Sequence, residues 1–405
     1  MSIEAVLDAI EADEPRLNAV ATLLRDRAMS GGGPGPLQNL PVAVKDLFAI
    51  AGVPTKFGAD PVFWERPVAD SAVVARLEAA GAIIVATSQM LEFAYGALNP
   101  GIGQTNNPVN PQRTAGGSSG GLAALVAAGH VRFAVGTDTG GSIRIPASYC
   151  GIVGMKPTHG LVPLDGALPL SWTLDHAGPL TRNISDARTL LAVLAGRDMP
   201  RVARPVRGLR LGVLAAHRDA ACITPDVRAA FDAACEKLAR AGAVLHDVGI
   251  PELTHVSPAL MLILLPEATV IHAARLARAP DRMADATRLQ LDAGAAIPAT
   301  AYVRALQFRR KFSMAFAAVF GHCDAVLSPT VAFVAPAEDP PMEEGGGSDE
   351  LLCSAPANLA GLPAITLPCG WDRDNMPIGL QLTGAAGADA ALLDIAEAIE
   401  AQLAG

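Results

Sequence analysis

Short apolar runs alternate with amphipathic segments over most of the chain, and this alternation constrains the fold more than any other feature of the sequence. A helix is predicted over 71–80 with Asp70 as its N-cap, and a second helix over 122–128 ends before Gly129. Buried strands are predicted for the runs LPVAVK, which forms a strand over 41–44 that ends at Lys45, AIIVAT and VRFAVGT. Strands and helices in this order predict an α/β fold.

The same rhythm returns after residue 205. LRLGVLA, AVLHDVG, AVLSPTVAF, PAITLPCG and PIGLQLTG are typical of strands, Thr224 is the expected cap of a helix that runs to Ala241, and residues 256–320 are mostly helical in pattern. A helix closes the chain. At the other end, the first 28 residues predict two short helices broken near Pro15, and the acidic, glycine-rich stretch at 338–350 predicts a surface loop.

The chain shows neither an internal repeat nor a linker that divides it. We therefore predict a single domain over 1–405. Within it we expect a catalytic core at about 38–200, a helical region that shapes the substrate pocket at about 250–320, and closing strands and a helix at 323–405.

Composition limits the classes of partner. The chain has 51% hydrophobic and 18% charged residues and a net charge of -9, without a block of Lys or Arg, so we expect neither nucleic acid nor an anionic membrane surface as its main partner. Its N-terminal segment lacks the basic and apolar regions of a secretory signal, and no window approaches about 20 uninterrupted apolar residues. The six cysteines are scattered without metal-ligand spacing. We expect a cytoplasmic protein that uses no metal or other cofactor.

Two glycine–serine clusters interrupt the apolar pattern, GGSSGG at 116–121 and TGGS at 139–142. Amide hydrolysis calls for an activated nucleophile, a base, and hydrogen-bond donors for the developing oxyanion. Ser142 follows two glycines whose N–H groups are unshielded, and this makes it a candidate nucleophile. Lys45, desolvated at a strand end, is a candidate neutral base, and Ser118 could carry a proton between them.

Three other interpretations fit parts of this pattern. GGSSGG matches the nucleophile elbow of α/β-hydrolases through Ser118 or Ser119, but an elbow needs a preceding strand, and NNPVNPQRTA is typical of a loop. A phosphate-binding P-loop would need a lysine that neither cluster carries. In the plainest interpretation, both clusters are tight turns and Lys45 extends its amine to solvent from a strand end.

Resemblance to a known family favours the catalytic interpretation. LPVAVKDLF, RTAGGSSGG and GTDTGGSIRIPASYCGIVGMKPTHG resemble the three hallmark segments of the amidase signature family. The similarity extends to SQMLEFAYG, LDHAGPLTRNISDA, NLAGLPAITLPCG and PIGLQLTG, so it covers most of the chain and is weakest over 200–320. It implies the amidase signature fold, with a large central mixed β-sheet covered by helices on both faces.

The resemblance also implies a Ser-cisSer-Lys triad. Ser142 corresponds to the nucleophile, Ser118 to the bridging serine after a cis bond from Gly117, and Lys45 to the base. The implied oxyanion hole consists of the backbone N–H groups of Thr139, Gly140, Gly141 and Ser142. The remaining matched polar residues are expected to support the structure rather than to react: Ser119, Asp138, Arg144, His159 and His176.

The implied activity is that of a free-standing serine amidohydrolase, which cleaves the C–N bond of small amides. The same machinery could also cleave carbamates, ureas or the C–O bond of esters. The residues expected to line the pocket are apolar and would be equally ordinary in a core: Met90, Phe93, Tyr95, Leu170 and Trp172.

An alternative is the glutamine-hydrolysing A subunit of a tRNA-dependent amidotransferase, which resembles this chain in the same motifs. The chain departs from the family pattern at Gln89 and Gln104, where relatives often have asparagine and proline, and at Ile145, where A subunits usually have glutamine. Ile145 and the shorter chain favour the free-standing enzyme. Because dimers are common among relatives, the resemblance also leaves a homodimer open.

Overall fold

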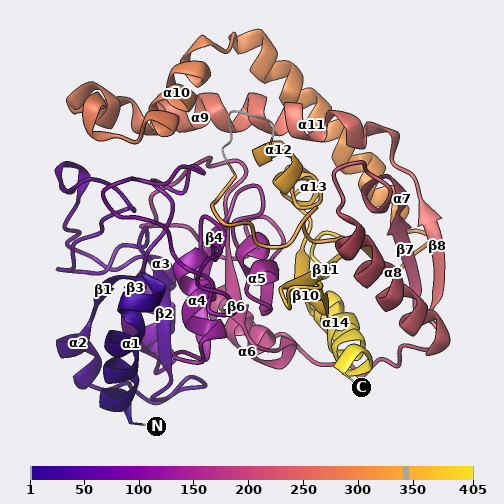
Figure 1. Ribbon diagram of the computed structural model, residues 1–405, viewed down its shortest axis with the longest axis horizontal. Helices are drawn as coiled ribbons and strands as arrows, with labels where there is room; N and C mark the ends of the chain where they lie inside the picture. Colours follow the sequence, from indigo (N-terminus) through magenta and orange to yellow (C-terminus); the bar gives the residue numbers. More distant parts are fainter. Residues whose placement is uncertain (1, 341–345, 405) are drawn as a thin grey trace.

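The computed structural model describes residues 2–340 and 346–404, and a mixed β-sheet lies at its centre (Figure 1). Its strands are β1 (Val20–Leu23), β2 (Pro41–Lys45), β3 (Ile83–Ser88), β4 (Phe133–Asp138), β5 (Val153–Lys156), β6 (His176–Thr181), β7 (Arg210–Leu214), β8 (Val244–Val248), β9 (Ala325–Pro329), β10 (Ala364–Trp371) and β11 (Pro377–Thr383). Across the sheet they run in the order β1-β3-β2-β4-β6-β5-β10-β11-β9-β7-β8. β2 is parallel to both of its neighbours, whereas the strands from β4 to β9 in this order pair antiparallel.

The helices of the described residues lie on both sides of the sheet, and a group of long helices lies above it in the view of Figure 1. They are α1 (Ile3–Leu17), α2 (Arg25–Met29), α3 (Ala72–Ala79), α4 (Gly120–Ala127), α5 (Arg144–Tyr149), α6 (Ile184–Ala195), α7 (Ala215–Arg218), α8 (Pro225–Arg240), α9 (Val256–Arg278), α10 (Asp285–Ala296), α11 (Ala299–Val319), α12 (Gly346–Leu351), α13 (Ala355–Ala360) and α14 (Asp389–Ala404). Short 3₁₀ turns lie at Pro61–Phe63, Pro251–His255 and Pro280–Arg282.

Both faces of the sheet are buried, and alternation along the strands explains why. Val42 and Val44 of β2 belong to an apolar core that includes Leu190 of α6, whereas Ala43 between them belongs to a second core that includes Leu122 of α4. Successive side chains of a strand point to opposite faces, so α4 and α6 pack against opposite sides of the sheet. The predicted α/β fold, with a large mixed sheet and helices on both faces, is confirmed.

The long helices α9, α10 and α11 lie together at the top of the view in Figure 1. Glu267 of α9 is buried, and its carboxylate accepts hydrogen bonds from Ser171 Oγ (2.6 Å), Thr173 Oγ1 (2.9 Å) and Tyr302 Oη (2.9 Å). These bonds join α9 to α11 and to the loop that precedes β6. The helical group therefore holds a loop that contains Leu170, one of the residues expected at the substrate pocket.

Within the described residues, the segment Pro251–Arg278 is long and apolar enough to cross a membrane by length and composition. It contains no run of about 20 uninterrupted apolar residues, because polar and charged residues such as Glu267 and His272 interrupt it. A core helix passes the same test, and α9 contacts α10, α11 and α13 while it buries the hydrogen-bonded carboxylate of Glu267. The contacts identify α9 as a packed helix of this fold.

The N-terminal prediction of two helices broken near Pro15 was also wrong. α1 continues through Pro15 and ends at Asn18, whose left-handed backbone (φ 47°) allows its N–H to bond Glu14 O. The segment Val20–Leu23 then pairs with β3 as the edge strand β1. Pairing with a neighbouring strand decided its conformation, and such pairing is not visible in a local pattern.

Two smaller expectations need correction. The N-cap of α3 is Ser71, whose Oγ accepts from Val74 N, while Asp70 Oδ1 accepts from Ala51 N. The prediction of a surface loop over 338–350 was wrong from residue 346 onward, where α12 begins. Residues 341–345 of the predicted loop lie outside the described residues. α12 carries Glu350 toward the pocket described below.

Candidate active site

Lys45 is the last residue of β2, a strand with a neighbour on each side, and its side chain is completely buried (0% exposed). Its Nζ donates to Ser118 Oγ at 2.6 Å and to Thr137 Oγ1 at 3.0 Å. Among the described residues it forms no salt bridge. The interpretation in which Lys45 extends its amine to solvent was therefore wrong.

The electrostatic surroundings of Lys45 favour the neutral amine. Burial lowers the pKa of Lys45 to about 7, and the negative charges of Asp138 and Asp175 oppose that shift only in part. A neutral amine has a lone pair that can accept a proton. Above pH 7 the arrangement can therefore supply a base next to Ser118.

Two loops bring the serines to the carboxyl ends of β2 and β4. Ser118 and Ser119 lie just before α4, and the peptide bond between Gly117 and Ser118 is cis. The residues before them form a loop, so the strand that a nucleophile elbow requires is not there. Ser119 N donates to Ser142 O (3.2 Å) and Ser119 Oγ to Thr137 O (3.3 Å), so Ser119 ties the two loops together.

Ser118 and Ser142 line one pocket, which is open to solvent and which we call the serine pocket. Ser118 is 2% exposed and Ser142 is half-buried. The described hydrogen bonds join Lys45 to Ser118 but do not include one between the two serine hydroxyls. Catalytic hydrogen bonds are often long before substrate binds, so the shared pocket is the relevant observation. Other residues that line it include Tyr95, Thr139, Gly140, Ile145 and Leu264.

The loop between β4 and α5 has the composition that an oxyanion hole needs. Among the described residues, the N–H groups of 139–142 donate no backbone hydrogen bond outside regular strands and helices. A Cβ on Gly141 would collide with Ser354 Oγ and with Ile145, and a Cβ on Gly140 would meet Leu351 at 3.3 Å. Glycine is therefore needed at 141 for the loop to pack, and N–H groups without a backbone partner can stabilise a developing negative charge.

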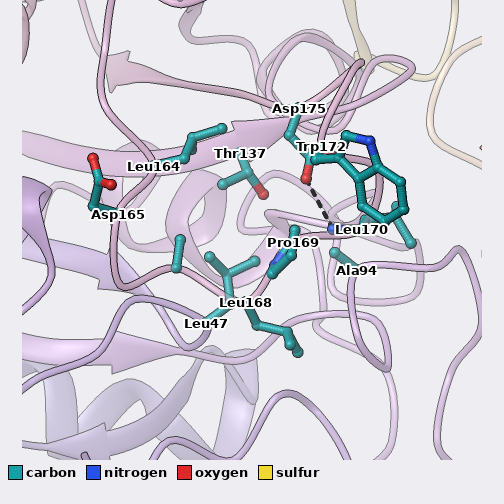
Figure 2. A pocket seen from close by; sticks show the side chains of 11 residues that line it. Leu47, Ala94, Thr137, Leu164, Asp165, Leu168, Pro169, Leu170, Trp172 and Asp175 are labelled. Carbon is teal, nitrogen blue, oxygen red and sulfur yellow. Dashed lines mark hydrogen bonds between the residues drawn. The ribbon is translucent and has the colours of Figure 1, made fainter. Parts of the chain in front are cut away.

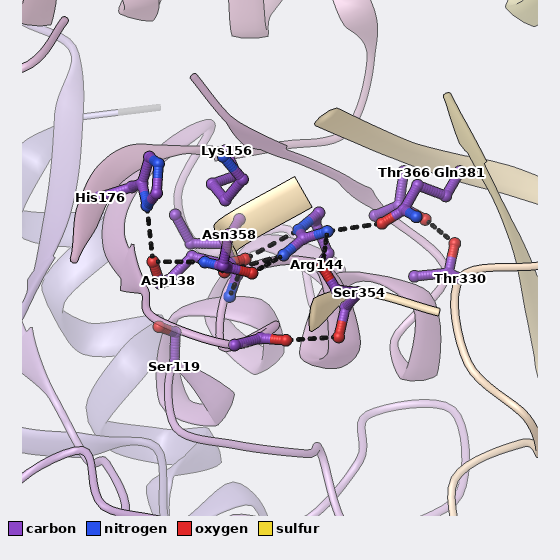
Figure 3. Close-up of polar contacts among 12 residues, drawn as sticks. Ser119, Asp138, Arg144, Lys156, His176, Thr330, Ser354, Asn358, Thr366 and Gln381 are labelled. Carbon is purple, nitrogen blue, oxygen red and sulfur yellow. Dashed lines mark hydrogen bonds and ion pairs between the residues drawn. The ribbon is translucent and has the colours of Figure 1, made fainter. Parts of the chain in front are cut away.

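A buried ion pair supports this loop (Figure 3). Arg144 Nε donates to Asp138 Oδ2 and Nη2 donates to Oδ1, each at 2.9 Å, and both side chains are fully buried. Burial alone would raise the pKa of Asp138, but the charge and hydrogen bonds of Arg144 outweigh it and hold that pKa below its usual range. The ion pair thereby joins the last residue of β4 to the first residue of α5.

Several further partners of this ion pair come from the C-terminal part of the chain, and sequence reasoning missed them. Arg144 donates to Ser354 O (2.9 Å), Asn358 Oδ1 (2.6 Å) and Gln381 Oε1 (2.6 Å), and Asn358 Nδ2 donates to Asp138 Oδ1 (2.8 Å). Ser354 Oγ donates to Gly140 O at 2.5 Å. The signal was present in the matched segments NLAGLPAITLPCG and PIGLQLTG, which include Asn358 and Gln381.

His176 lies beside this network rather than in the pocket. Its Nδ1 lies 2.7 Å from Leu174 O and 3.2 Å from Asp138 O, and its ring meets that of His159 edge-on. Burial lowers the pKa of His176 well below its usual range, so the ring is neutral. Neither histidine lines the serine pocket.

The five residues expected at the pocket divide into three groups. Tyr95 and Leu170 line the serine pocket. Trp172 is 48% exposed and lines a second pocket that shares Ala94 and Leu170 with the first (Figure 2). Met90 and Phe93 are buried in the core, where Phe93 packs against Phe63 and His272.

Asp175 connects the two pockets to the loop between β4 and α5. It accepts from Thr139 Oγ1 (2.6 Å), Leu170 N (2.8 Å) and Ser171 N (3.1 Å), and Figure 2 shows it beside Thr137 in the second pocket. Burial raises the pKa of Asp175 to about 6 despite these hydrogen bonds. The sequence analysis did not select this residue, although it lies in the matched segment LDHAGPLTRNISDA.

Replacing Arg144 tests the role of the ion pair. Arg144→Met leaves Asp138 buried without its cation, so the free energy of unfolding should fall by about 3–5 kcal/mol in urea titrations followed by circular dichroism. The exposed pair of Arg288 with Asp285 provides the control, because Arg288→Gln should cost less than about 1 kcal/mol. Equal effects of the two substitutions would contradict a bracing role for Arg144.

Comparison with known proteins agrees with this geometry. A family model described as Amidase matches residues 2–393. An amidase from Pseudomonas putida is 37% identical over 92% of this chain and 86% of its own length, and the A subunit of a glutamyl-tRNA(Gln) amidotransferase from Koribacter versatilis (strain Ellin345) is 33% identical over 99% and 94%. A solved amidase structure superposes with a TM-score of 0.91 at 35% identity and covers 99% of this chain and 95% of its own. The chain therefore belongs to the amidase signature family and is an enzyme that acts on carbon–nitrogen bonds.

Proposed function

We propose that the chain is a free-standing serine amidohydrolase that cleaves the C–N bond of small amides through an acyl-enzyme on Ser142. The observation that carries the proposal is the buried Lys45 amine, which lies 2.6 Å from the hydroxyl of Ser118 in the pocket that Ser142 also lines. A base without a counterion, next to two hydroxyls and a row of backbone N–H groups, has the parts that acyl transfer requires.

In the proposed acylation, Ser118 gives its proton to neutral Lys45 and takes one from Ser142. Ser142 Oγ forms a bond to the acyl carbon, and the carbonyl oxygen becomes an oxyanion facing the N–H groups of 139–142. The proton held by Lys45 then passes through Ser118 to the leaving nitrogen as the C–N bond breaks. Water hydrolyses the acyl-enzyme by the same path, and Lys45 returns to the neutral state.

The pocket supports a small substrate with apolar character. Its lining includes Leu91, Ile145, Leu170 and Leu264, and apolar walls of this kind are typical of small-molecule sites. Esters, carbamates and ureas also pass through a tetrahedral oxyanion, so the same residues can act on them. The side chains that line the serine pocket must therefore determine which of these substrate classes the enzyme prefers.

The second candidate is the A subunit of a tRNA-dependent amidotransferase, because relatives of that description are as similar as the amidases. Free glutamine carries an α-carboxylate, which proteins commonly bind with Arg or Lys. Among the described residues that line the serine pocket there is no Lys, Arg or His, and the sequence PMEEG at 341–345 contains none. This composition and the apolar Ile145 on the wall favour the free-standing enzyme.

Ser142→Ala tests the nucleophile. Turnover of simple aryl amides such as acetanilide by the purified chain should fall by about a thousandfold or more, because the atom that bonds the acyl group is missing. A fluorophosphonate should add to wild type but not to the variant, as read by intact-protein mass spectrometry. Ser313→Ala on α11 outside the pocket is the control and should match wild type.

A wild-type chain that is labelled at Ser142 but does not turn over simple amides, and that hydrolyses glutamine only with added partner proteins, would favour the amidotransferase interpretation. Labelling at another residue would remove Ser142 from the mechanism.

The pKa of Lys45 sets the pH dependence. Because the amine must be neutral to accept a proton, kcat/KM for an uncharged amide should rise with pH through about 7 and level off above it. Lys45→Arg keeps a cation that does not deprotonate in this range, so turnover should fall by about 10²–10⁴ and the step near pH 7 should vanish. An unchanged step in the variant would show that another group titrates.

A further inference from the structure

The serine pocket has an acidic wall that the proposed mechanism does not use. Asp339, in the segment that follows β9, and Glu350 of α12 both line it, and both are half-buried. Glu350 Oε1 accepts from Tyr149 Oη at 2.7 Å, and Asp339 Oδ1 accepts from Thr114 Oγ1 at 2.8 Å. These hydrogen bonds fix the two carboxyl groups in the same pocket as Ser142.

No cation compensates this wall within the described part of the chain. Neither Asp339 nor Glu350 takes part in a salt bridge there, and the pocket has no basic side chain in its lining. Two carboxyl groups that share a partly desolvated pocket repel each other when both are ionised. A protein gains nothing in stability from such an arrangement, and perturbed carboxyl groups of this kind are typical of functional sites.

The titration of the pair follows from its surroundings. Burial, and then the charge of Asp339, raise the pKa of Glu350 to about 8, with Tyr149 as its hydrogen-bond donor. Burial raises the pKa of Asp339 to about 6, against the hydrogen bond from Thr114. In the empty pocket near pH 7 one carboxyl group therefore keeps its proton. A ligand cation placed between them would favour ionisation of both.

Tyr95 supplies an independent polar group in the same pocket. Its side chain is 2% exposed, it lines the serine pocket, and its hydroxyl has no hydrogen-bond partner among the described residues. A buried tyrosine hydroxyl normally has a partner. The Tyr95 hydroxyl is therefore a hydrogen-bond donor without a partner among the described residues, on a residue that lines the pocket of the nucleophile.

We propose that the serine pocket selects small amides that carry a protonated amine, with the ammonium group bound by Asp339 and Glu350 and the apolar part of the substrate against Leu170 and Leu264. This inference rests on the proposed function for the identity of the reacting bond. The apolar wall holds the hydrocarbon segment between the ammonium and the amide, and the acidic wall rejects substrates that carry a carboxylate.

Two isosteric pairs of substrates test the proposal, each pair differing only by ammonium against methyl. The acyl-side pair is 5-aminopentanoyl anilide and hexanoyl anilide, and the amine-side pair is the acetamide of 4-(aminomethyl)aniline and that of 4-ethylaniline. Wild type should prefer the cationic member of at least one pair by about tenfold or more in kcat/KM, as a charge-assisted contact predicts. That preference should grow as the pH rises toward 8, where Glu350 ionises more fully.

Glu350→Gln keeps an oxygen for Tyr149 and removes the charge. It should lower kcat/KM for the preferred ammonium substrate by about tenfold and leave the neutral partner within about twofold, and Asp339→Asn should act in the same direction. Glu350→Asp should restore part of the preference. The matched control is Glu338→Gln, which removes an exposed carboxylate next to Asp339 and should change neither substrate.

The outcomes separate this inference from the proposed function. Turnover of neutral and cationic members at equal kcat/KM, or a preference for the neutral ones, would overturn the acidic-wall proposal while the serine mechanism stands. If no substrate is turned over, calorimetry on Ser142→Ala with 5-aminopentanamide and hexanamide still decides the matter. The proposal is supported if Ser142→Ala binds the ammonium compound more tightly than hexanamide and if adding Glu350→Gln removes this difference. Equal affinity of Ser142→Ala for the two compounds overturns it.

Discussion

A lysine amine buried without a carboxylate partner is the constraint on which the rest of this structure depends. Lys45 is fully enclosed at the end of β2, and the groups that it contacts, Ser118 and Thr137, are neutral hydroxyls. The cost of placing a charge there lowers its pKa toward neutrality. A group that would ordinarily be a cation is therefore the one that we propose as the base.

The structure keeps the nearby carboxylate from reversing this effect. Asp138 lies close enough to raise the pKa of Lys45, but Arg144 neutralises Asp138 with two hydrogen bonds. Arg144 is in turn held by Asn358 and Gln381 from the C-terminal segments. The antiparallel strands β5, β10 and β11 bring those segments back beside the first half of the sheet, so the sheet order positions the groups that offset the charge of Asp138 near Lys45.

The local sequence pattern predicted those strands and loops whose conformation depends on neighbouring residues in the sequence. The strand ending at Lys45 and the glycine-rich loops around Ser118 and Ser142 were visible because apolar alternation and clustered glycines are short-range signals. Contacts between distant segments were not visible: Gln381 as a partner of Arg144, the edge strand β1, and the core position of Phe93 all depend on which segments meet. Glu350 escaped notice for the same reason, since its sequence context resembles a polar loop.

The central claim is that Lys45 is neutral near physiological pH, and direct titration of this amine tests it. The chain has five lysines, at positions 45, 56, 156, 237 and 311, so the 13Cε resonances of a lysine-labelled sample are few enough to follow by NMR from pH 5 to 11, and Lys45→Arg identifies the resonance of Lys45. The structure predicts a midpoint near pH 7 for that resonance. A midpoint close to the ordinary value of about 10.4 would contradict the account, because Lys45 would then be a cation at every pH at which the enzyme is proposed to work.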